Sequence, residues 1–173
     1  MTTATTREDG LRAIVDATAS AVADDPGKAA ALFRATGEGA EGVRTEIRIG
    51  RHAVTIDEPP ALGGDDAAIN PVESALAALL SCQVVTYRFW AAKLGIPLDD
   101  VRVRTEGDLD VRGFFGLDEA VRPGFGEVRL AVELRGPAPA EDYARLQETV
   151  DAHCPVLDLF RNTTPVATSL TTG

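Results

Sequence analysis

The order of apolar and polar residues predicts a helix followed by a β-hairpin in the first third of the chain. Residues 8–25 carry apolar side chains at helical spacing, so we expect an amphipathic helix that ends before Pro26. Residues 43–49 alternate between apolar and polar, as a half-buried strand does. A tight turn at Gly50 then leads into a second strand over residues 52–56, which completes the hairpin.

Two short segments lie between this helix and the hairpin. The apolar run at residues 29–33 is compatible with a helix or with the start of a strand. Residues 36–42 are rich in glycine and glutamate, a composition that favours a turn.

The strongest helix pattern in the sequence begins at Asn70. Asn70 is a good N-cap, Pro71 suits the first helical position, and Glu73 completes a capping box. Gly95 predicts the end of this helix. Its apolar side recurs every three or four residues as one stripe, which contains Val72, Ala75, Leu76, Leu79, Cys82, Val85, Thr86 and Phe89. The stripe places Cys82 on the packed side of the helix.

The last part of the chain predicts two more strands, a helix and a closing strand. We expect strands over residues 98–109 and 126–134, joined by a connection that contains glycine and phenylalanine, residues 112–125. Residues 140–153 predict a helix with one apolar face, made by Tyr143, Leu146, Val150 and Cys154. Residues 166–170 predict an edge strand. Strands grouped around long helices, without a regular strand–helix alternation, indicate an α+β fold with antiparallel sheets.

Length and charge limit the number of domains and the classes of partner that this chain can have. A chain of 173 residues can form one domain with its own core. A formal net charge of −10 argues against nucleic acid or an anionic membrane as a partner, because both are polyanionic. The polar first ten residues lack the apolar segment of a secretory signal, and no apolar run has the length of a membrane span. We therefore expect a cytoplasmic protein.

Two cysteines, Cys82 and Cys154, are the candidate reactive groups. In the cytosol a cysteine pair is more often reduced than permanently bridged. A thiolate can attack the O–O bond of a peroxide and become a sulfenic acid. Burial on an apolar helical face disfavours the thiolate of Cys82, so an arginine would have to stabilise it. Alternatively, both cysteines are only packed in the core.

Other candidate side chains predict no metal and no nucleotide cofactor. His52 and His153 do not stand at metal-ligand spacing with the cysteines, and no glycine-rich loop matches a phosphate-binding motif. Phe114, Phe115 and Phe125 either line an apolar pocket for a hydroperoxide or belong to a dimer interface. We favour the interface.

Five segments carry a pattern that extends over most of the chain. They are residues 57–64 (DEPPALGG), 70–73 (NPVE), 77–82 (AALLSC), 107–117 (GDLDVRGFFGL) and 154–156 (CPV). Taken in this order and with this spacing, they resemble the signature of the OsmC/Ohr family. The resemblance divides the chain into an N-terminal helical extension, residues 1–35, and an OsmC-like domain, residues 36–173.

The resemblance implies both a fold and an activity. The implied fold is an intertwined α+β homodimer in which antiparallel sheets wrap around central helices. The implied activity is that of a thiol-dependent peroxidase that reduces organic hydroperoxides in oxidative stress defence. Cys82 would be the peroxidatic cysteine and Cys154 the resolving one. The implied reductant is a dithiol, such as a lipoyl group on a protein, or a small thiol.

Two positions depart from the peroxidase branch of that family. The branch has a glutamate directly after the Asn-Pro of the central helix, where it holds an arginine beside the sulfur. Here that position is Val72, and Glu73 follows one residue later. The first hairpin turn, where the branch carries its arginine, has none here, which leaves Arg34 or Arg44 as the nearest substitutes. The alternative function is a non-catalytic OsmC-like dimer that binds a small apolar ligand at the subunit interface.

Overall fold

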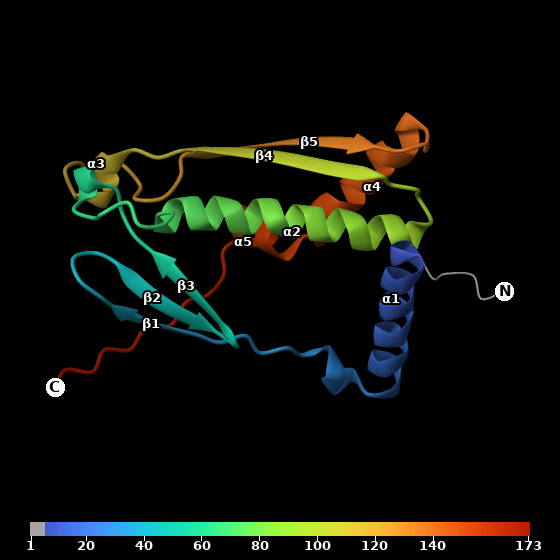
Figure 1. Ribbon diagram of the computed structural model, residues 1–173, viewed down its shortest axis with the longest axis horizontal. Coiled ribbons are helices and arrows are strands. Elements are labelled where there is room, and N and C mark those ends of the chain that lie inside the picture. The colour runs from blue at the N-terminus through green and yellow to red at the C-terminus, as the bar shows by residue number, and fades with distance from the viewer. Residues whose placement is uncertain (1–5) are drawn as a thin grey trace.

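The computed structural model describes residues 6–173, and the chain forms helices and two separate antiparallel sheets, β1-β2-β3 and β4-β5 (Figure 1). This combination confirms the predicted α+β class. The helices are α1 (Arg7–Asp24), α2 (Pro71–Leu94), α3 (Val111–Phe114), α4 (Ala140–His153) and α5 (Pro155–Arg161), with 3-10 turns η1 (Pro26–Ala29) and η2 (Pro60–Leu62). The strands are β1 (Ala35–Gly39), β2 (Thr45–Ile49), β3 (His52–Ile56), β4 (Asp100–Asp108) and β5 (Glu127–Arg135).

The sheet β1-β2-β3 confirms the predicted hairpin and adds a strand to it. β2 pairs with β3 from Thr45↔Ile56 to Ile49↔His52. The turn predicted over residues 36–42 is wrong for most of its length, because β1 pairs with β2 along all five of its residues. The glycines of β1 weaken its strand pattern in the sequence, yet their backbone groups still join the ladder, so pairing overrides local propensity.

Helix α2 begins and ends where the sequence predicts. The Glu73 N–H donates to Asn70 Oδ1 (2.8 Å), and the Asn70 N–H donates to Glu73 Oε2 (2.9 Å), which is the predicted capping box. Gly95 follows with a left-handed φ of 68°, a conformation that favours glycine. By length and composition α2 could cross a membrane, as the core helices of soluble proteins often could. Here it packs against β4, α4 and α5.

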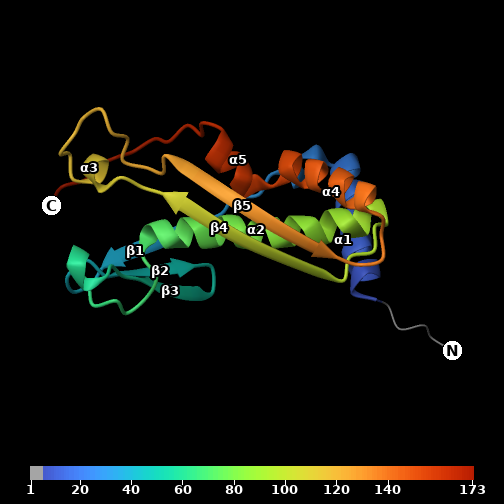
Figure 2. The ribbon, with the colours of Figure 1, turned by 90° about the horizontal axis from the view of Figure 1, so that it is seen from above.

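Most of the core lies between α2, the β4-β5 ribbon, and helices α4 and α5. Helices α4 and α5 follow one another beside the ribbon in Figure 2. One buried cluster contains Tyr87 and Leu146, and a second contains Leu79, Cys154 and Leu157. The apolar face predicted for residues 140–153 is confirmed, because Leu146, Val150 and Cys154 are all buried.

The predicted stripe on α2 is correct for Leu79 and Thr86 but wrong for Val85, which is 54% exposed. Gln83 and Tyr87, both outside the stripe, are buried. Since α2 packs against a sheet and against two helices, its buried surface is wider than one stripe.

The two ends of the described chain pack loosely. Helix α1 buries none of its residues and crosses the end of α2, where the Arg12 Nε–H donates to the Ala92 carbonyl oxygen (3.1 Å). Residues 30–34 form neither a helix nor a strand. The edge strand predicted over residues 166–170 is also wrong, since no regular element follows α5. Val166 is 82% exposed and belongs to neither of the two sheets.

Candidate functional site

Cys82 lies in the middle of α2 and is half-buried. Its Sγ is 4.0 Å from Oγ1 of Thr86, one helical turn further on. The Thr86 hydroxyl donates to the Cys82 carbonyl oxygen at 2.7 Å, a common arrangement for threonine within a helix. The helix therefore holds the sulfur at a fixed position while leaving part of its surface exposed.

Cys154 lies at the junction of α4 and α5. Its N–H donates to the Val150 carbonyl oxygen (2.9 Å), and its own carbonyl oxygen accepts from the Asp158 N–H (3.0 Å). Pro155 starts α5 directly after it, because proline suits the first helical position and cannot continue α4. The side chain of Cys154 is 2% exposed.

The fold brings the two predicted cysteines together. Cys82 packs against the cluster that contains Cys154, Leu79 and Leu157, and the Cys154 thiol lies close enough to shift the pKa of Cys82. Both cysteines are thiols in the structure. Residues far apart in sequence thus form one candidate site.

The immediate surroundings of Cys82 favour its neutral form. Burial raises the pKa of this thiol, the Val156 backbone N–H lowers it by a smaller amount, and the neighbouring Cys154 raises it again. Over residues 6–173, no arginine, lysine or histidine is among the groups that shift this pKa. Among the described residues of one chain, therefore, no cation acts on this thiol to stabilise its ionised form.

Neither predicted arginine reaches Cys82 within the chain. Arg34 is exposed in the segment before β1. Arg44 acts instead on the buried Asp57, whose pKa is lowered mainly by the Ala67 N–H and more weakly by Arg44. Glu73 is bound to Asn70 in the capping box and so holds the start of α2.

A cavity of about 610 Å³ adjoins the cysteine cluster. It shares Leu79, Leu157 and Phe160 with that cluster, and β5 forms much of its apolar wall. Gln83, the residue after Cys82, lines the cavity, is 1% exposed, and its Nε2 has no hydrogen-bond partner within the described chain. Gln83 is not among the site residues predicted from the sequence, although a glutamine inside the apolar run LLSCQVV is itself an indication of a polar site.

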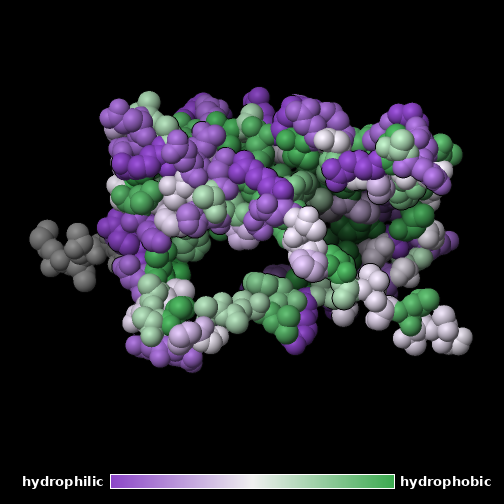
Figure 3. Space-filling model, turned by 180° about the vertical axis from the view of Figure 1, so that it is seen from behind, coloured by the Kyte–Doolittle hydropathy of each residue, from purple (hydrophilic) through white to green (hydrophobic). Residues whose placement is uncertain are grey.

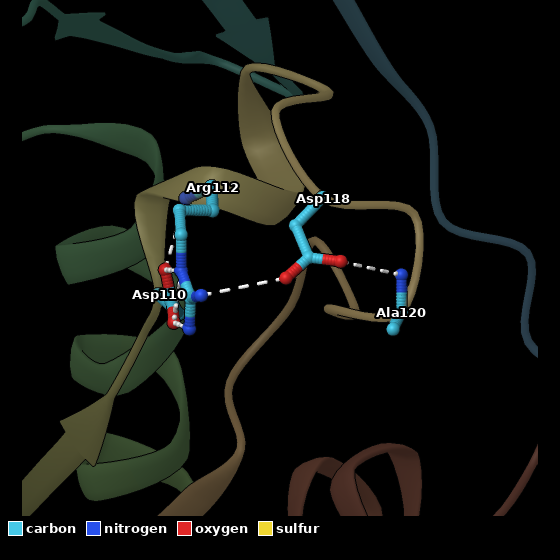
Figure 4. A network of polar contacts seen from close by, with 4 residues as sticks. All are labelled: Asp110, Arg112, Asp118 and Ala120. Atoms are coloured by element: carbon cyan, nitrogen blue, oxygen red, sulfur yellow. Dashed lines mark hydrogen bonds and ion pairs between the residues drawn. The ribbon is translucent and has the colours of Figure 1, made fainter.

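The connection between β4 and β5 contributes part of the lining of this cavity. The Arg112 guanidinium binds Asp110 (2.6 Å) and Asp118 (3.4 Å), and Asp118 accepts from the Ala120 N–H (3.1 Å), so α3 is tied to the residues that follow it (Figure 4). The same connection then places Arg122 and Phe125 at the cavity.

The predicted phenylalanines separate into two groups. Phe114 and Phe115 are 66% and 53% exposed and contact each other edge to face. Phe125 lines the cavity, and its ring centroid is 6.4 Å from that of Phe160. Phe125 therefore lies at a cavity, which is the less favoured of the two predictions, and Phe114 and Phe115 do not line that cavity. The predicted dimer interface stays a prediction for all three.

The histidines take structural positions. His153 packs against Trp90, with ring centroids 4.4 Å apart, and His52 pairs with Ile49 in the hairpin. Among residues 6–173, no group of three or more His, Cys, Asp or Glu side chains is placed to hold a metal ion.

A family comparison agrees with this geometry. The family of OsmC-like proteins matches residues 63–169, a range that contains α2, both cysteines and the cavity. The chain belongs to the OsmC-like family. A search of curated protein sequences gave no match.

Solved structures show the same fold at low sequence identity. An OsmC-like protein from Mycoplasma pneumoniae superposes with a TM-score of 0.63 at 16% identity, covering 76% of this chain and 88% of that one. An organic hydroperoxide resistance protein OsmC from Legionella pneumophila gives 0.59 at 22%, covering 76% and 90%. An OsmC-like protein of unknown function from Vibrio cholerae gives 0.58 at 13%, covering 75% and 94%. The OsmC-like fold is therefore shared by proteins described as hydroperoxide resistance factors and by others without a described activity.

Proposed function

We propose that this OsmC-like protein is a cytoplasmic, thiol-dependent peroxidase that reduces small organic hydroperoxides in oxidative stress defence. The observation that carries the proposal is the convergence of Cys82 and Cys154 in one cluster. Some relatives of the same fold are described as organic hydroperoxide resistance proteins, which supports this reaction class.

In the proposed reaction, the Cys82 thiolate attacks one oxygen of the hydroperoxide, ROOH, and the O–O bond breaks. Cys82 becomes a sulfenic acid, and the leaving alkoxide takes a proton to become the alcohol. The Cys154 sulfur then attacks the Cys82 sulfur, which forms a disulfide and releases water. A dithiol, such as a protein-bound lipoyl group, is oxidised as it reduces this disulfide and restores both thiols.

The first step needs a positive charge beside Cys82, because burial raises the pKa of that thiol. We propose that an intertwined homodimer supplies it, with an arginine such as Arg34 or Arg44 contributed by the second copy. Both arginines lie in the part of the chain whose surfaces are least covered. An ion pair that lowers a thiol pKa by two units contributes about 2.7 kcal/mol. Here the cation must also offset the rise in the pKa of Cys82 that burial causes.

Exposed apolar surface supports the homodimer. A groove along β2 and β3 is lined by Ile47, Ile49, Val54 and Ile69, and three of these are exposed by 39–51%. The segment after η1 exposes Leu32 by 72% and Phe33 by 89%, and Figure 3 shows an open passage between this segment and the body of the molecule. Large apolar side chains in such numbers favour a partner, and a second copy buries the same surfaces on both chains.

Peroxide consumption tests the proposed function. Reduced protein with cumene hydroperoxide and dihydrolipoamide should consume the peroxide catalytically, whereas Cys82→Ser should not. Cys154→Ser should retain a single turnover and lose repeated turnover, because the sulfenic acid forms but is not resolved. Ser81→Ala, at the exposed neighbouring position, is the matched control and should keep the full rate. Consumption that survives in Cys82→Ser would overturn the mechanism.

The second candidate function is a non-catalytic dimer that binds a small apolar ligand. The raised pKa of Cys82 and the cavity next to it both favour this alternative. No peroxide loss at all, in protein shown to be dimeric and reduced, would select it over the peroxidase.

A further inference from the structure

Tyr87 carries a buried hydroxyl that binds no other group within the described chain. Its side chain is 0% exposed, and its oxygen has no hydrogen-bond partner among residues 6–173. An unpaired hydroxyl in a core costs free energy, and a redox or catalytic role is one reason for a native protein to keep it. Because this oxygen is sealed from solvent, its partner must be a neighbouring protein group rather than water or a ligand.

Helix α4 brings two candidate acceptors beside Tyr87. Tyr87 packs in the cluster that contains Val150, and the Cys154 N–H donates to the Val150 carbonyl oxygen at 2.9 Å. Burial raises the pKa of Tyr87 most, and Asp151 and Cys154 both lie close enough to raise it further, to about 12. The hydroxyl is thus enclosed beside the end of α4, where the proposed resolving thiol lies.

Of these two acceptors, Cys154 shares the burial of Tyr87. The Asp151 side chain is 34% exposed, lines the cavity and binds the Arg161 guanidinium at 3.1 Å. Cys154 is 2% exposed. Water and Arg161 can therefore satisfy the Asp151 carboxylate, whereas burial separates the Cys154 sulfur from water.

The protonation state of Cys154 explains why Tyr87 has no partner in the dithiol form. A thiol is a weak acceptor, whereas a thiolate is a charged one, and hydrogen bonds to charged groups are about twice as strong as neutral ones. With a pKa of about 12, the Tyr87 hydroxyl keeps its proton at neutral pH and remains a donor. The hydroxyl therefore gains a strong acceptor only when Cys154 ionises.

The titratable groups around Cys154 come from three helices: Cys82 and Tyr87 from α2, Asp151 and His153 from α4, and Asp158 from α5. His153 packs against Trp90, and the Asp158 carboxylate accepts from Asn162. The side chains of β5 that pack on the cysteine cluster, Val128 and Leu130, are apolar. Negative charge on Cys82 or the carboxylates would disfavour a second thiolate, so Tyr87 is the group among these that can stabilise it.

We propose that Tyr87 is a positioning residue for the resolving step, in which its hydroxyl donates a hydrogen bond to the ionised sulfur of Cys154. This role rests on the proposed peroxidase reaction. In that step the Cys154 thiolate attacks the Cys82 sulfur, and the S–O bond of the sulfenic acid breaks. The leaving hydroxide takes up the proton that Cys154 released and becomes water. Tyr87 keeps its own proton and increases the share of Cys154 that is ionised.

Quenched-flow mass spectrometry on the full chain separates the two chemical steps. After one equivalent of cumene hydroperoxide, Tyr87→Phe should form the Cys82 sulfenic acid at the unchanged rate. At neutral pH it should form the disulfide about 3- to 10-fold more slowly, since less Cys154 is ionised. In alkaline solution below the pKa of Tyr87 it should be equal or faster, because a thiolate without the hydrogen bond is the better nucleophile. Equal disulfide rates, or the same slowing at both pH values, would overturn the proposal.

Tyr143→Phe is the matched control. The Tyr143 hydroxyl donates to the Pro97 carbonyl oxygen at 2.8 Å, so this variant loses a formed bond and should unfold at a lower urea concentration. Its disulfide rate should be unchanged. Tyr87→Phe should show the reverse, with full stability and a slower resolving step. A resolving step that slows equally in Tyr143→Phe would contradict a specific role for Tyr87.

The ionisation of Cys154 can be followed without any peroxide. In Cys82→Ser, Cys154 is the one cysteine left in the chain, so the ultraviolet absorbance of the thiolate reports on that sulfur alone. Adding Tyr87→Phe should reduce the ionised share about 10-fold at pH values where Cys154 is mostly neutral. An unchanged titration would rule out the proposed hydrogen bond, whether or not the chain reduces peroxides.

Carbon-13 NMR covers the case in which Tyr87→Phe does not fold. The chain has two tyrosines, so labelling at tyrosine Cζ gives two resonances, which Tyr143→Phe assigns. In Cys82→Ser the Tyr87 resonance should shift as Cys154 ionises, and it should stay in place when Cys154→Ser is added. A Tyr87 resonance that ignores Cys154 would overturn the proposed contact. A response of Tyr87 in a chain that consumes no peroxide would support the contact and contradict only the proposed peroxidase.

Discussion

The parts of the chain before and after Pro71 differ in how much of themselves they bury. Before Pro71, Ile56 is the one buried apolar residue in the described chain, α1 buries none, and every residue of β1 is exposed. All other buried apolar residues lie between Leu79 and Leu157. The second part therefore holds a core by itself, whereas the first has amphipathic elements without a surface to cover them.

This difference explains where the candidate chemistry lies. The cysteines and the cavity belong to the part with the core, where packing fixes side chains in place, and the family match covers the same range. The first part offers exposed arginines and apolar side chains that the core does not use. A second copy would let each part complete what the other lacks.

The largest effect on stability is expected from a substitution in the core of the second part. Leu146→Ala, at a side chain that is 0% exposed, should lower the free energy of unfolding by about 2–5 kcal/mol. Ile49→Ala, at a residue that is 47% exposed in β2, should cost less than about 0.5 kcal/mol in dilute monomer. Urea denaturation at several protein concentrations measures both.

The concentration series also tests the dimer. If a second copy covers β2, the loss of unfolding free energy caused by Ile49→Ala should grow with protein concentration. The loss caused by Leu146→Ala should not grow in this way, because Leu146 is already buried within one chain. A small, constant cost for Ile49→Ala, together with a monomeric mass in solution, would contradict the proposed homodimer.

A smaller effect concerns pH and the buried face of α2. Burial, and then the nearby Asp151, raise the pKa of Tyr87 to about 12. Because the folded state favours the neutral phenol, this contribution to stability is complete below pH 10 and is lost as the pH rises toward 12, by at most about 2.7 kcal/mol. Tyr87→Phe should remove this part of the alkaline loss. An identical decline in stability for both proteins above pH 10 would show that Tyr87 is not the group responsible.

Tyr87→Phe should also leave stability near neutral pH unchanged or higher. The Tyr87 hydroxyl is buried and has no hydrogen-bond partner within residues 6–173, so its removal sacrifices no bond.

The smallest expected effect on stability comes from removing the N-cap side chains of α2 and α1. Asn70 and Thr6 each form a capping box, at the starts of α2 and α1. Asn70→Ala should cost about 1 kcal/mol of global stability, because α2 is part of the core. Thr6→Ala should cost only a few tenths, since α1 buries no residue and can fray independently. In Thr6→Ala, faster amide hydrogen exchange should be confined to α1. Global destabilisation by that variant would contradict the difference in stability between the parts before and after Pro71.

The sequence predicts those features that depend on local chemistry. The capping box at Asn70, the stop at Gly95, the hairpin and the apolar face around Leu146 follow from hydrogen bonds and periodicities within a few residues. β1 and the tail near Val166 were predicted wrongly, because pairing with a neighbouring strand decides whether such weak patterns form strands.

The candidate site was predictable in part for the same reason. Cys82 and Cys154 stand out by residue type, and the family resemblance suggested that they meet. Gln83 is recognisable in the sequence only as a polar residue within an apolar run, and its burial depends on how α2 packs against β4 and α4, which no local pattern of α2 shows. The surroundings of the Cys82 sulfur also depend on long-range packing, and this includes the absence of a nearby cation within the described part of one chain.

The most direct test of the proposed chemistry is peptide mass mapping after a single turnover. One equivalent of cumene hydroperoxide, added to reduced protein and followed by blocking of free thiols, should yield a Cys82–Cys154 disulfide within one chain, with a mass decrease of about 2 Da. The dithiol should reverse it. Recovery of both cysteines as blocked thiols, or of Cys82 as a sulfinic acid with Cys154 unreacted, would contradict the mechanism.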